Sequence, residues 1–503
     1  MTTILTKLLH RGLCRILRLA PVGALVSAPL RAATSDYPKP EALLQRHIDA
    51  IGGAAALRQA NGLAFKGEVA LPFVKAQAPI EFLFQPPDRF YCWFRYHHAF
   101  FGFLKVPFVA KRTAECGYDG TNGWMVDFEH NVEPLYGSDE AFMRGLLDKF
   151  SPLCFGRSFP LTRTLDITRF ADRDCYRVLI VFPFGEHAFE YYDLQNGLLV
   201  GTIYPFEADD ALLNIRTVYE DFRSVGGGLR LPFRMEVQVG NQLYSIQATE
   251  VRTDLAGARV PGSKYRSPPK PLPCLKPASI PGRDVIERYL AASGGADALR
   301  RHRSLHLSGS YEIPGAHGFT NRLEIFSALT NRLYFTLPTP KGLYREGCDG
   351  EHCWKVDIKD IKLAEGKELE QKLLERQFLS DLHAPESFRS IETVGTINLD
   401  DHECYQLLLI RQNGEVLDEF YDVRTGLLRG RNTADERTGG AINLLARFEG
   451  YRLFGDWRLP TRQSYRLTGD AQVVAITNAE WDTTPAAVFE MPAEVKARLG
   501  RSQ

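Results

Sequence analysis

The sequence predicts a mainly β protein of two consecutive domains, each an antiparallel meander with a helix at its start and a second helix partway along. Three observations predict this fold class. A series of short sequence blocks occurs twice in the same order, about 240 residues apart. Segments that alternate apolar and polar residues dominate both copies and are separated by turn sequences. Two stretches in each copy instead repeat apolar residues every three or four positions, as helices do.

Five blocks match between the two halves, which predicts a tandem of two related domains, each large enough to bury its own core. The opening blocks are Ile51-Gly52-Gly53-Ala54-Ala55-Ala56-Leu57-Arg58 and Ser293-Gly294-Gly295-Ala296-Asp297-Ala298-Leu299-Arg300. The middle blocks are Asp119-Gly120 with Trp124 and Asp127 against Asp349-Gly350 with Trp354 and Asp357, and Cys175-Tyr176 against Cys404-Tyr405. The closing blocks are Tyr192-Asp193 with Gly197-Leu198-Leu199 against Tyr421-Asp422 with Gly426-Leu427-Leu428, and Leu231-Pro232 against Leu459-Pro460.

Residues 1–33 have the pattern of a cleavable signal peptide. They contain no acidic residue, and basic residues precede a short apolar run from Leu19 to Ala28, with Ala32 and Ala33 at the expected cleavage position. The run is too short to span a bilayer permanently. An uncleaved anchor and an organelle transit peptide are the alternatives. We expect export to the periplasm.

The charge balance argues against nucleic acid as a partner. The chain has 61 basic and 61 acidic residues, and five of the basic ones lie in residues 1–33, so that 56 remain against 61 after cleavage. A mildly acidic protein lacks the basic surface that phosphate backbones attract. No later stretch approaches transmembrane length.

A proline-rich segment separates the halves. Residues 259–281 contain seven prolines between Pro261 and Pro281, and such a segment neither pairs into a sheet nor forms a helix. The sequence therefore predicts a first domain over residues 36–258, a linker over 259–281 and a second domain over 282–498.

Each domain begins with an amphipathic helix and continues as strands. The apolar spacing of Leu43, Leu44 and Ile48, and of Val285 and Ile286, predicts helices that the following Gly-Gly pairs end. The segments after them alternate in polarity and are divided by turn signals at roughly hairpin intervals.

A second helix is predicted inside each meander, from Asp139 to Phe150 and from Lys367 to Leu382. A helix inserted within a sheet must lie across one face, because both elements have apolar sides to bury. The helix faces are interpreted first as core and second as a surface for an apolar ligand. The candidate ligand contacts on them are Phe142, Leu146, Phe150, Leu369, Leu373 and Phe378.

The order of these blocks, from about Tyr37 to Val251 and from Ile280 to Trp481, resembles the outer-membrane lipoprotein-sorting proteins and their LolA-like and LolB-like relatives. The resemblance implies two tandem half-open antiparallel β-barrels, each with an N-terminal helix and a helical plug or lid. It further implies an apolar cavity for acyl chains and a periplasmic role as carrier, lipid-binding relative or envelope regulator. The tandem departs from the single-domain carriers, which argues against direct lipoprotein sorting.

The first half carries about 13 extra residues between Arg89 and Asp119, rich in aromatic side chains where a connection is expected. Two interpretations stay open. The segment packs over its own domain, or it forms an apolar lip that meets a ligand, a membrane surface or a protein partner. The candidate lip residues are Phe100, Phe101, Phe103, Leu104 and Phe108.

Cys348 and Cys353 flank a tight turn at residues 349–352, so that a hairpin would place them across two strands and a short disulfide is expected. The alternative, a metal site with His352, lacks a fourth ligand nearby. The other cysteines of the expected mature chain have no pairing that spacing alone can fix.

No enzyme motif is present, and the recurring Asp119 and Asp349 are explained by turn chemistry and the tryptophans by core packing. We therefore expect no catalytic residue, no metal and no cofactor. The sequence favours a periplasmic, non-enzymatic binding or transport protein for lipid or lipoprotein acyl chains. The alternative is an envelope scaffold or stress sensor that binds a protein partner through its two barrels.

Overall fold

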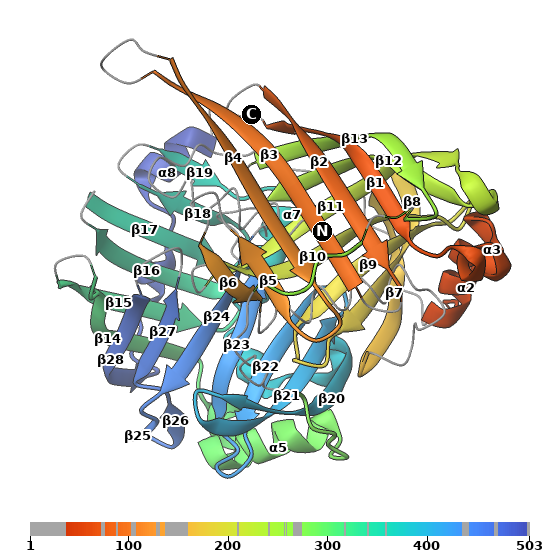
Figure 1. Ribbon diagram of the computed structural model, residues 1–503. Coiled ribbons are helices and arrows are strands. Elements are labelled where there is room, and N and C mark those ends of the chain that lie inside the picture. Colours follow the sequence, from red (N-terminus) through yellow and green to blue (C-terminus); the bar gives the residue numbers. More distant parts are fainter. Residues whose placement is uncertain are drawn as a thin grey trace. The chain divides into compact units, whose positions relative to one another are not determined.

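A computed structural model of the chain describes residues 37–499, apart from 72–75, 87–88, 102–106, 127–130, 136–158, 209–210, 240–241, 256, 258, 265–273, 316–317, 340–341, 358–359, 435–441 and 467–470. The chain forms two compact units (Figure 1). Unit 1 comprises residues 1–275 with 434–443, and unit 2 comprises residues 276–433 with 444–503. The expected signal peptide and part of the proline-rich linker lie outside the described residues.

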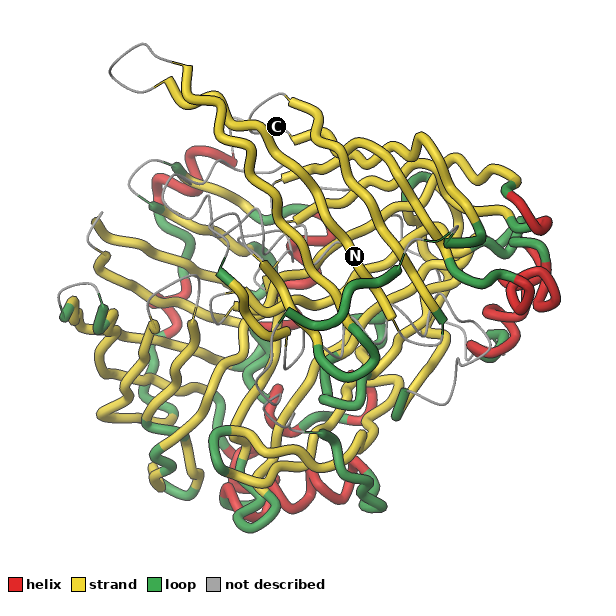
Figure 2. The backbone as a smooth tube through the Cα atoms, viewed as in Figure 1, coloured by secondary structure: helices red, strands yellow, loops and turns green. Residues whose placement is uncertain are grey.

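Strands dominate both units (Figure 2). In unit 1 the helices are α2 (Pro40–Ala50) and α3 (Gly53–Gln59), and a 3-10 turn, η2, covers Gly226–Gly228. Its strands are β1 (Leu63–Leu71), β2 (Ala76–Gln85), β3 (Arg89–Phe101), β4 (Pro107–Tyr118), β5 (Gly123–Val126), β6 (Val132–Leu135), β7 (Leu161–Phe170), β8 (Arg173–Val181), β9 (His187–Asp193), β10 (Leu199–Ala208), β11 (Ala211–Ser224), β12 (Arg230–Val239) and β13 (Gln242–Arg252).

The strands of unit 1 form one antiparallel sheet in which chain neighbours pair and the last strand returns to the first. The order is β7-β8-β9-β10-β11-β12-β13-β1-β2-β3-β4-β5-β6. No pairing among the described residues joins β6 to β7, so the sheet is open rather than a closed barrel. The expected antiparallel meander is confirmed.

Unit 2 repeats this plan. Its helices are α5 (Gly282–Ser293), α6 (Ala296–Arg301), α7 (Gly366–Glu375) and α8 (Ala493–Leu499), with 3-10 turns η3 (Ser380–Leu382), η4 (Pro385–Ser387) and η6 (Ala486–Phe489). Its strands are β14 (Ser304–Ile313), β15 (Phe319–Ala328), β16 (Arg332–Thr339), β17 (Gly342–Asp349), β18 (Cys353–Val356), β19 (Ile361–Leu363), β20 (Phe388–Leu399), β21 (His402–Arg411), β22 (Val416–Asp422), β23 (Leu428–Ala434), β24 (Ile442–Glu449), β25 (Arg452–Phe454), β26 (Trp457–Leu459), β27 (Arg462–Arg466) and β28 (Ala471–Trp481).

The pairing in unit 2 is again antiparallel throughout. One run is β20-β21-β22-β23, and another is β24-β27-β28-β14-β15-β16-β17-β18-β19. As in unit 1, the first strand pairs with both the second and the last. β25 and β26 form a separate small hairpin.

The Gly-Gly pairs join the start of each unit to its end. Gly52 and Gly294 adopt φ angles of 118° and 131°, which favour glycine. A Cβ atom on Gly52 would lie 2.3 Å from the carbonyl oxygen of Gly228, and one on Gly294 would lie 2.1 Å from that of Asp456. The opening block of each half therefore recurs because the loop before the Leu-Pro block packs directly on its backbone.

The recurring Asp-Gly and Trp residues have structural roles. The Asp119 carboxylate accepts hydrogen bonds from the backbone N–H groups of Thr121 and Asn122, at 2.9 and 2.8 Å, and Asp349 caps its turn in the same way. Trp124 is fully buried and packs over Gly117, where a Cβ atom would lie 2.8 Å from the ring. The interpretation of these residues as turn chemistry and core packing is confirmed.

The second helix of unit 2 is shorter than expected. It ends at Glu375 rather than at Leu382, and the chain then turns and forms η3. The apolar residues that extended the helical pattern pack elsewhere: the Phe378 ring meets Trp481 edge-on at 6.4 Å, and Leu379 and Leu382 pack on the cluster around Trp457. Tertiary packing has thus overridden the local periodicity. The matching prediction, Asp139 to Phe150, lies outside the described residues.

Candidate functional site

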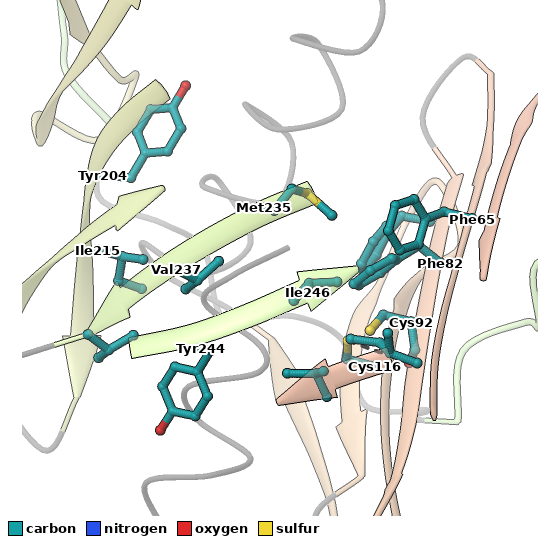
Figure 3. Close-up of a cluster of buried hydrophobic side chains, with 14 of the residues drawn as sticks. Phe65, Phe82, Cys92, Cys116, Tyr204, Ile215, Met235, Val237, Tyr244 and Ile246 are labelled. Atoms are coloured by element: carbon teal, nitrogen blue, oxygen red, sulfur yellow. Dashed lines mark hydrogen bonds between the residues drawn. The ribbon is translucent and has the colours of Figure 1, made fainter. Parts of the chain in front are cut away.

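One face of the sheet in unit 1 carries a broad apolar surface. On β1 the alternating residues Phe65 and Val69 are buried while Lys66 and Glu68 are exposed, as the period of two requires. A row across four strands places Phe65 opposite Phe82, then Cys92 and Cys116, and none of these side chains is more than 5% exposed. Figure 3 shows this row together with Met235, Val237 and Ile246 from β12 and β13.

The matching row in unit 2 is less covered. It runs from Leu307 on β14 to Ile325 on β15, Phe335 on β16 and Glu346 on β17, each directly opposite the next. The three apolar residues are half-buried rather than buried. A contiguous, partly exposed apolar surface on a folded protein is a candidate site for another molecule.

A neighbouring pair of residues widens this surface. Leu337 on β16 lies opposite Tyr344 on β17, and both are again half-buried. The rings of Phe335 and Tyr344 lie 5.8 Å apart. We refer to Leu307, Ile325, Phe335, Leu337 and Tyr344 as the unit 2 apolar face.

Glu346 attaches α7 to the end of this face. Its carboxylate accepts hydrogen bonds from the Tyr344 hydroxyl and the Arg376 guanidinium, each at 2.7 Å, and Lys372 Nζ lies 3.6 Å away. Burial alone would raise the pKa of Glu346, but the positive charges of Arg376 and Lys372 lower it, so that the carboxylate is ionised at neutral pH. The ion pairs fix α7 beside β17.

Each unit also has a buried glutamate where its first helix covers the sheet. In unit 1, Glu190 is 1% exposed and accepts hydrogen bonds from the hydroxyls of Tyr192 at 2.5 Å and Tyr204 at 2.8 Å. Burial, together with the Glu190 charge, raises the pKa of both tyrosines well above the ordinary value. They remain hydrogen-bond donors at every physiological pH.

In unit 2 the equivalent Glu419 belongs to an ionic network. His383 Nε2 lies 2.7 Å from one carboxylate oxygen, Arg431 Nε lies 2.6 Å from the other, and the Tyr421 hydroxyl also donates to Glu419. Glu419 and His383 are 1% and 2% exposed. Burial opposes both charges, but their mutual attraction prevails, so the pKa of Glu419 is held far below its usual range and that of His383 is raised.

His383 connects the chain segment after α7 to the sheet. Its backbone has a φ of 48°, which is unfavourable for a residue with a Cβ atom. The His383 carbonyl accepts a hydrogen bond from Arg283 of α5 at 2.7 Å, and its ring stacks at 5.9 Å from that of Phe388. These contacts fix η3 against β22.

Sequence reasoning missed Glu190, Glu419 and His383. The available signal was a charged residue inside an otherwise apolar alternation, in Ala188-x-Glu190-x-Tyr192 and Leu417-x-Glu419-x-Tyr421. A glutamate at such a position faces the core, and a buried carboxylate requires partners. The distant partners themselves, His383 and Arg431, have no signature in the local sequence.

The predicted lip is part of a hairpin and not a connection. Phe100 and Phe101 belong to β3 and Phe108 to β4, with Phe100 opposite Phe108. The extra residues of the first half lengthen two paired strands to 13 and 12 residues, compared with 8 each for β16 and β17. Strand pairing gives hydrogen-bond partners to backbone N–H and C=O groups that would lack them in a long loop. Phe103 and Leu104 lie outside the described residues.

Those candidate ligand contacts on the two predicted second helices that the structure describes do not lie together in one place. Phe142, Leu146 and Phe150 lie outside the described residues. Leu369 and Leu373 on α7 pack against the cluster of Cys348, Cys353 and Ala364. Phe378 contacts Trp481 instead and is not brought to the same place.

A disulfide joins Cys348 and Cys353, which lie opposite each other on β17 and β18. Within the described ranges, no cluster of three or more metal-binding side chains occurs. The same part of the chain contains no helix that is long and apolar enough to cross a membrane.

Comparison with known proteins gives matches only at the level of solved structures. No family model matches the chain, and no curated protein matches it. A LolA superfamily protein from Nitrosomonas europaea matches at 11% identity and a TM-score of 0.30, over 42% of this chain and 99% of that one. A DUF1329 family protein from Desulfovibrio piger matches at 14% identity and a TM-score of 0.31, over 42% and 98%.

The complex of MucA and MucB from Pseudomonas aeruginosa matches at 13% identity and a TM-score of 0.14, over 66% of this chain and 96% of that one. The matches thus include the LolA superfamily, which the sequence resembles. Likenesses at these TM-scores assign neither a family nor a function.

Proposed function

We propose that the protein binds lipid or lipoprotein acyl chains on the unit 2 apolar face, as a non-enzymatic binding or transport protein of the periplasm. The observation that carries the proposal is the half-buried row Leu307, Ile325 and Phe335, whose counterparts in unit 1 are buried. These three side chains have no polar atoms, so they suit contact with a hydrocarbon chain. Each methylene that such a face buries contributes about 0.8 kcal/mol.

The buried ion pairs of Glu346 with Lys372 and Arg376 mark where the apolar face ends at β17. An acyl chain would lie along Ile325, Phe335 and Leu337, with its polar group toward solvent. The role of a lip for Phe100, Phe101 and Phe108 remains a prediction of the sequence.

Leu337→Gln tests the face against Leu343→Gln as a matched control. Leu337 lies on the unit 2 apolar face, whereas Leu343 on the adjacent strand lies on the opposite face and is 49% exposed. Both positions tolerate a polar side chain because neither is fully buried. We expect the first variant to weaken binding of a fluorescent fatty acid about tenfold, since it loses roughly 1.5 kcal/mol of apolar contact, and the second to bind as the unaltered protein does.

Equal binding by both variants would contradict the assignment of the face. Absence of fatty-acid binding in the unaltered, delipidated protein would contradict the function itself. A stoichiometric protein partner that is retained from envelope extract regardless of its acylation would favour the scaffold or sensor alternative.

A further inference from the structure

Two cysteines of unit 1 lie directly opposite one another in the sheet. Cys92 on β3 and Cys116 on β4 form a registered pair, and both are 0% exposed. The Cys116 sulfur lies 3.8 Å from the Cys92 carbonyl oxygen. Figure 3 shows the two side chains next to each other on the apolar side of the sheet.

The separation suits a disulfide. Opposed residues of antiparallel strands have Cα atoms about 4.5 or 5.5 Å apart, and disulfides join Cα atoms about 4.4 to 6.8 Å apart. Unit 2 contains an example in the same fold, because Cys348 and Cys353 are also opposed in register and are joined. The pair in unit 1 therefore needs no change of strand register to form the bond.

The pairing is not a general feature of the buried cysteines. Cys175 faces Thr168 and Asp193 on its two neighbouring strands, and the matching Cys404 faces Ile397 and Asp422. The positions that match Cys92 and Cys116 in unit 2 are Phe335 and Glu346, so the fold itself does not require sulfur there.

We propose that Cys92 and Cys116 are an oxidisable dithiol that forms a cross-strand disulfide by exchange with an oxidising disulfide. One thiolate attacks the donor disulfide, forms a mixed disulfide and releases one donor thiolate. The second protein thiolate then attacks the cysteine sulfur of the mixed disulfide and releases the other donor thiolate. The two protons lost by the cysteines end on the two donor thiols, and the protein is oxidised by two electrons.

Burial determines when the exchange occurs. It raises the pKa of the Cys116 thiol well above its ordinary value, so the reactive thiolate is scarce in the folded unit. Neither sulfur is accessible to a donor while β3 and β4 are paired. The bond is expected to form as the hairpin closes during folding. It would then fix the register between β3 and β4, in the same hairpin that pairs Phe100 with Phe108.

Peptide mapping without reduction tests the proposal. The full-length chain is unfolded, reduced, and refolded with oxidised and reduced glutathione, and free thiols are then alkylated under denaturing conditions. We expect a peptide that links Cys92 to Cys116, with Cys175 and Cys404 alkylated. Alkylation of Cys92 and Cys116 in correctly refolded protein, or a link from either to a different cysteine, would overturn the proposal.

Two variants test whether the link is specific to Cys92 and Cys116. Cys175→Ala removes a buried thiol of the same unit and should leave the Cys92–Cys116 link intact, whereas Cys116→Ala should leave Cys92 as an alkylated thiol. The folded, reduced protein should react with a thiol reagent at these two positions only after denaturant is added. Rapid alkylation of Cys92 and Cys116 in the folded protein would contradict the order of events inferred here.

Discussion

Glu419 and His383 form a buried, charged pair whose stability depends on pH. The pKa of His383 is raised above its ordinary value of 6.5, so the stabilisation is complete below about pH 6.5 and is lost as the pH rises through the folded-state value. The pKa of Glu419 is lowered, so its contribution is present above its ordinary value of 4.5 and is lost as the pH falls toward the folded-state value. The network is thus strongest between these limits. The charged and titratable groups around it also include Arg431, Asp381, Tyr289 and Tyr421.

We expect His383→Gln to lower the free energy of unfolding by about 3 kcal/mol at pH 6, because it leaves a buried carboxylate without one of its charged partners. The difference from the unaltered protein should shrink as the pH is raised through the folded-state pKa of His383, where the imidazole loses its proton. Urea unfolding at several pH values measures both. His352→Gln is the control, since His352 is exposed and should change the free energy by less than about 0.5 kcal/mol. A difference that stays the same after His383 has lost its proton would contradict a contribution from its charge.

The residues of this network also show where sequence reasoning ends. Asp119 and Asp349 were assigned to turns correctly because an Asp-Gly turn is determined by residues two or three positions away. His383 and Glu419 are 36 residues apart, and their contact depends on the turn after α7. A local pattern contains no information on such a contact.

At the scale of elements, strands and first helices were predictable because one face of each is buried, which imposes a period on the sequence. The extra residues after Arg89 were expected to form a connection, but they extend β3 and β4. The expectation failed because an aromatic-rich segment is compatible with both a covered loop and a paired strand. Likewise, α7 ends before its apolar pattern does, because Phe378 and Leu382 pack on Trp481 and the Trp457 cluster.

The Gly-Gly element supplies a test with an internal control. Gly294→Ala introduces a Cβ atom 2.1 Å from the Asp456 carbonyl oxygen and strains a φ of 131°, whereas Gly295→Ala meets no atom within 4 Å and strains only a φ of 93°. We expect a loss of about 3 kcal/mol for the first and about 1 kcal/mol for the second. Thermal and urea unfolding measure the difference. Equal effects would show that the loop at Asp456 moves away freely.

At the scale of the whole chain, both units share one order of elements, from paired helices through a meander to a last strand that returns to the first. We infer from this order and the five sequence blocks that the chain arose by duplication. The two copies have since diverged in the covering of the same row of side chains. Phe65 and Phe82 are buried in unit 1, while Leu307 and Ile325 are half-buried in unit 2. The degree to which these side chains are buried could not be predicted from the sequence, because it depends on elements that are distant in the chain.

Native mass spectrometry of the full-length chain, expressed with residues 1–33 in a Gram-negative host and isolated from its periplasm, tests the central claim most directly. Spectra are recorded before and after denaturation, for the unaltered protein and for Leu337→Gln and Leu343→Gln. We predict discrete additions of lipid mass that denaturation removes, that Leu337→Gln reduces and that Leu343→Gln retains. A lipid-free mass for the unaltered folded protein, in the presence of envelope lipids, would contradict the claim that it binds acyl chains.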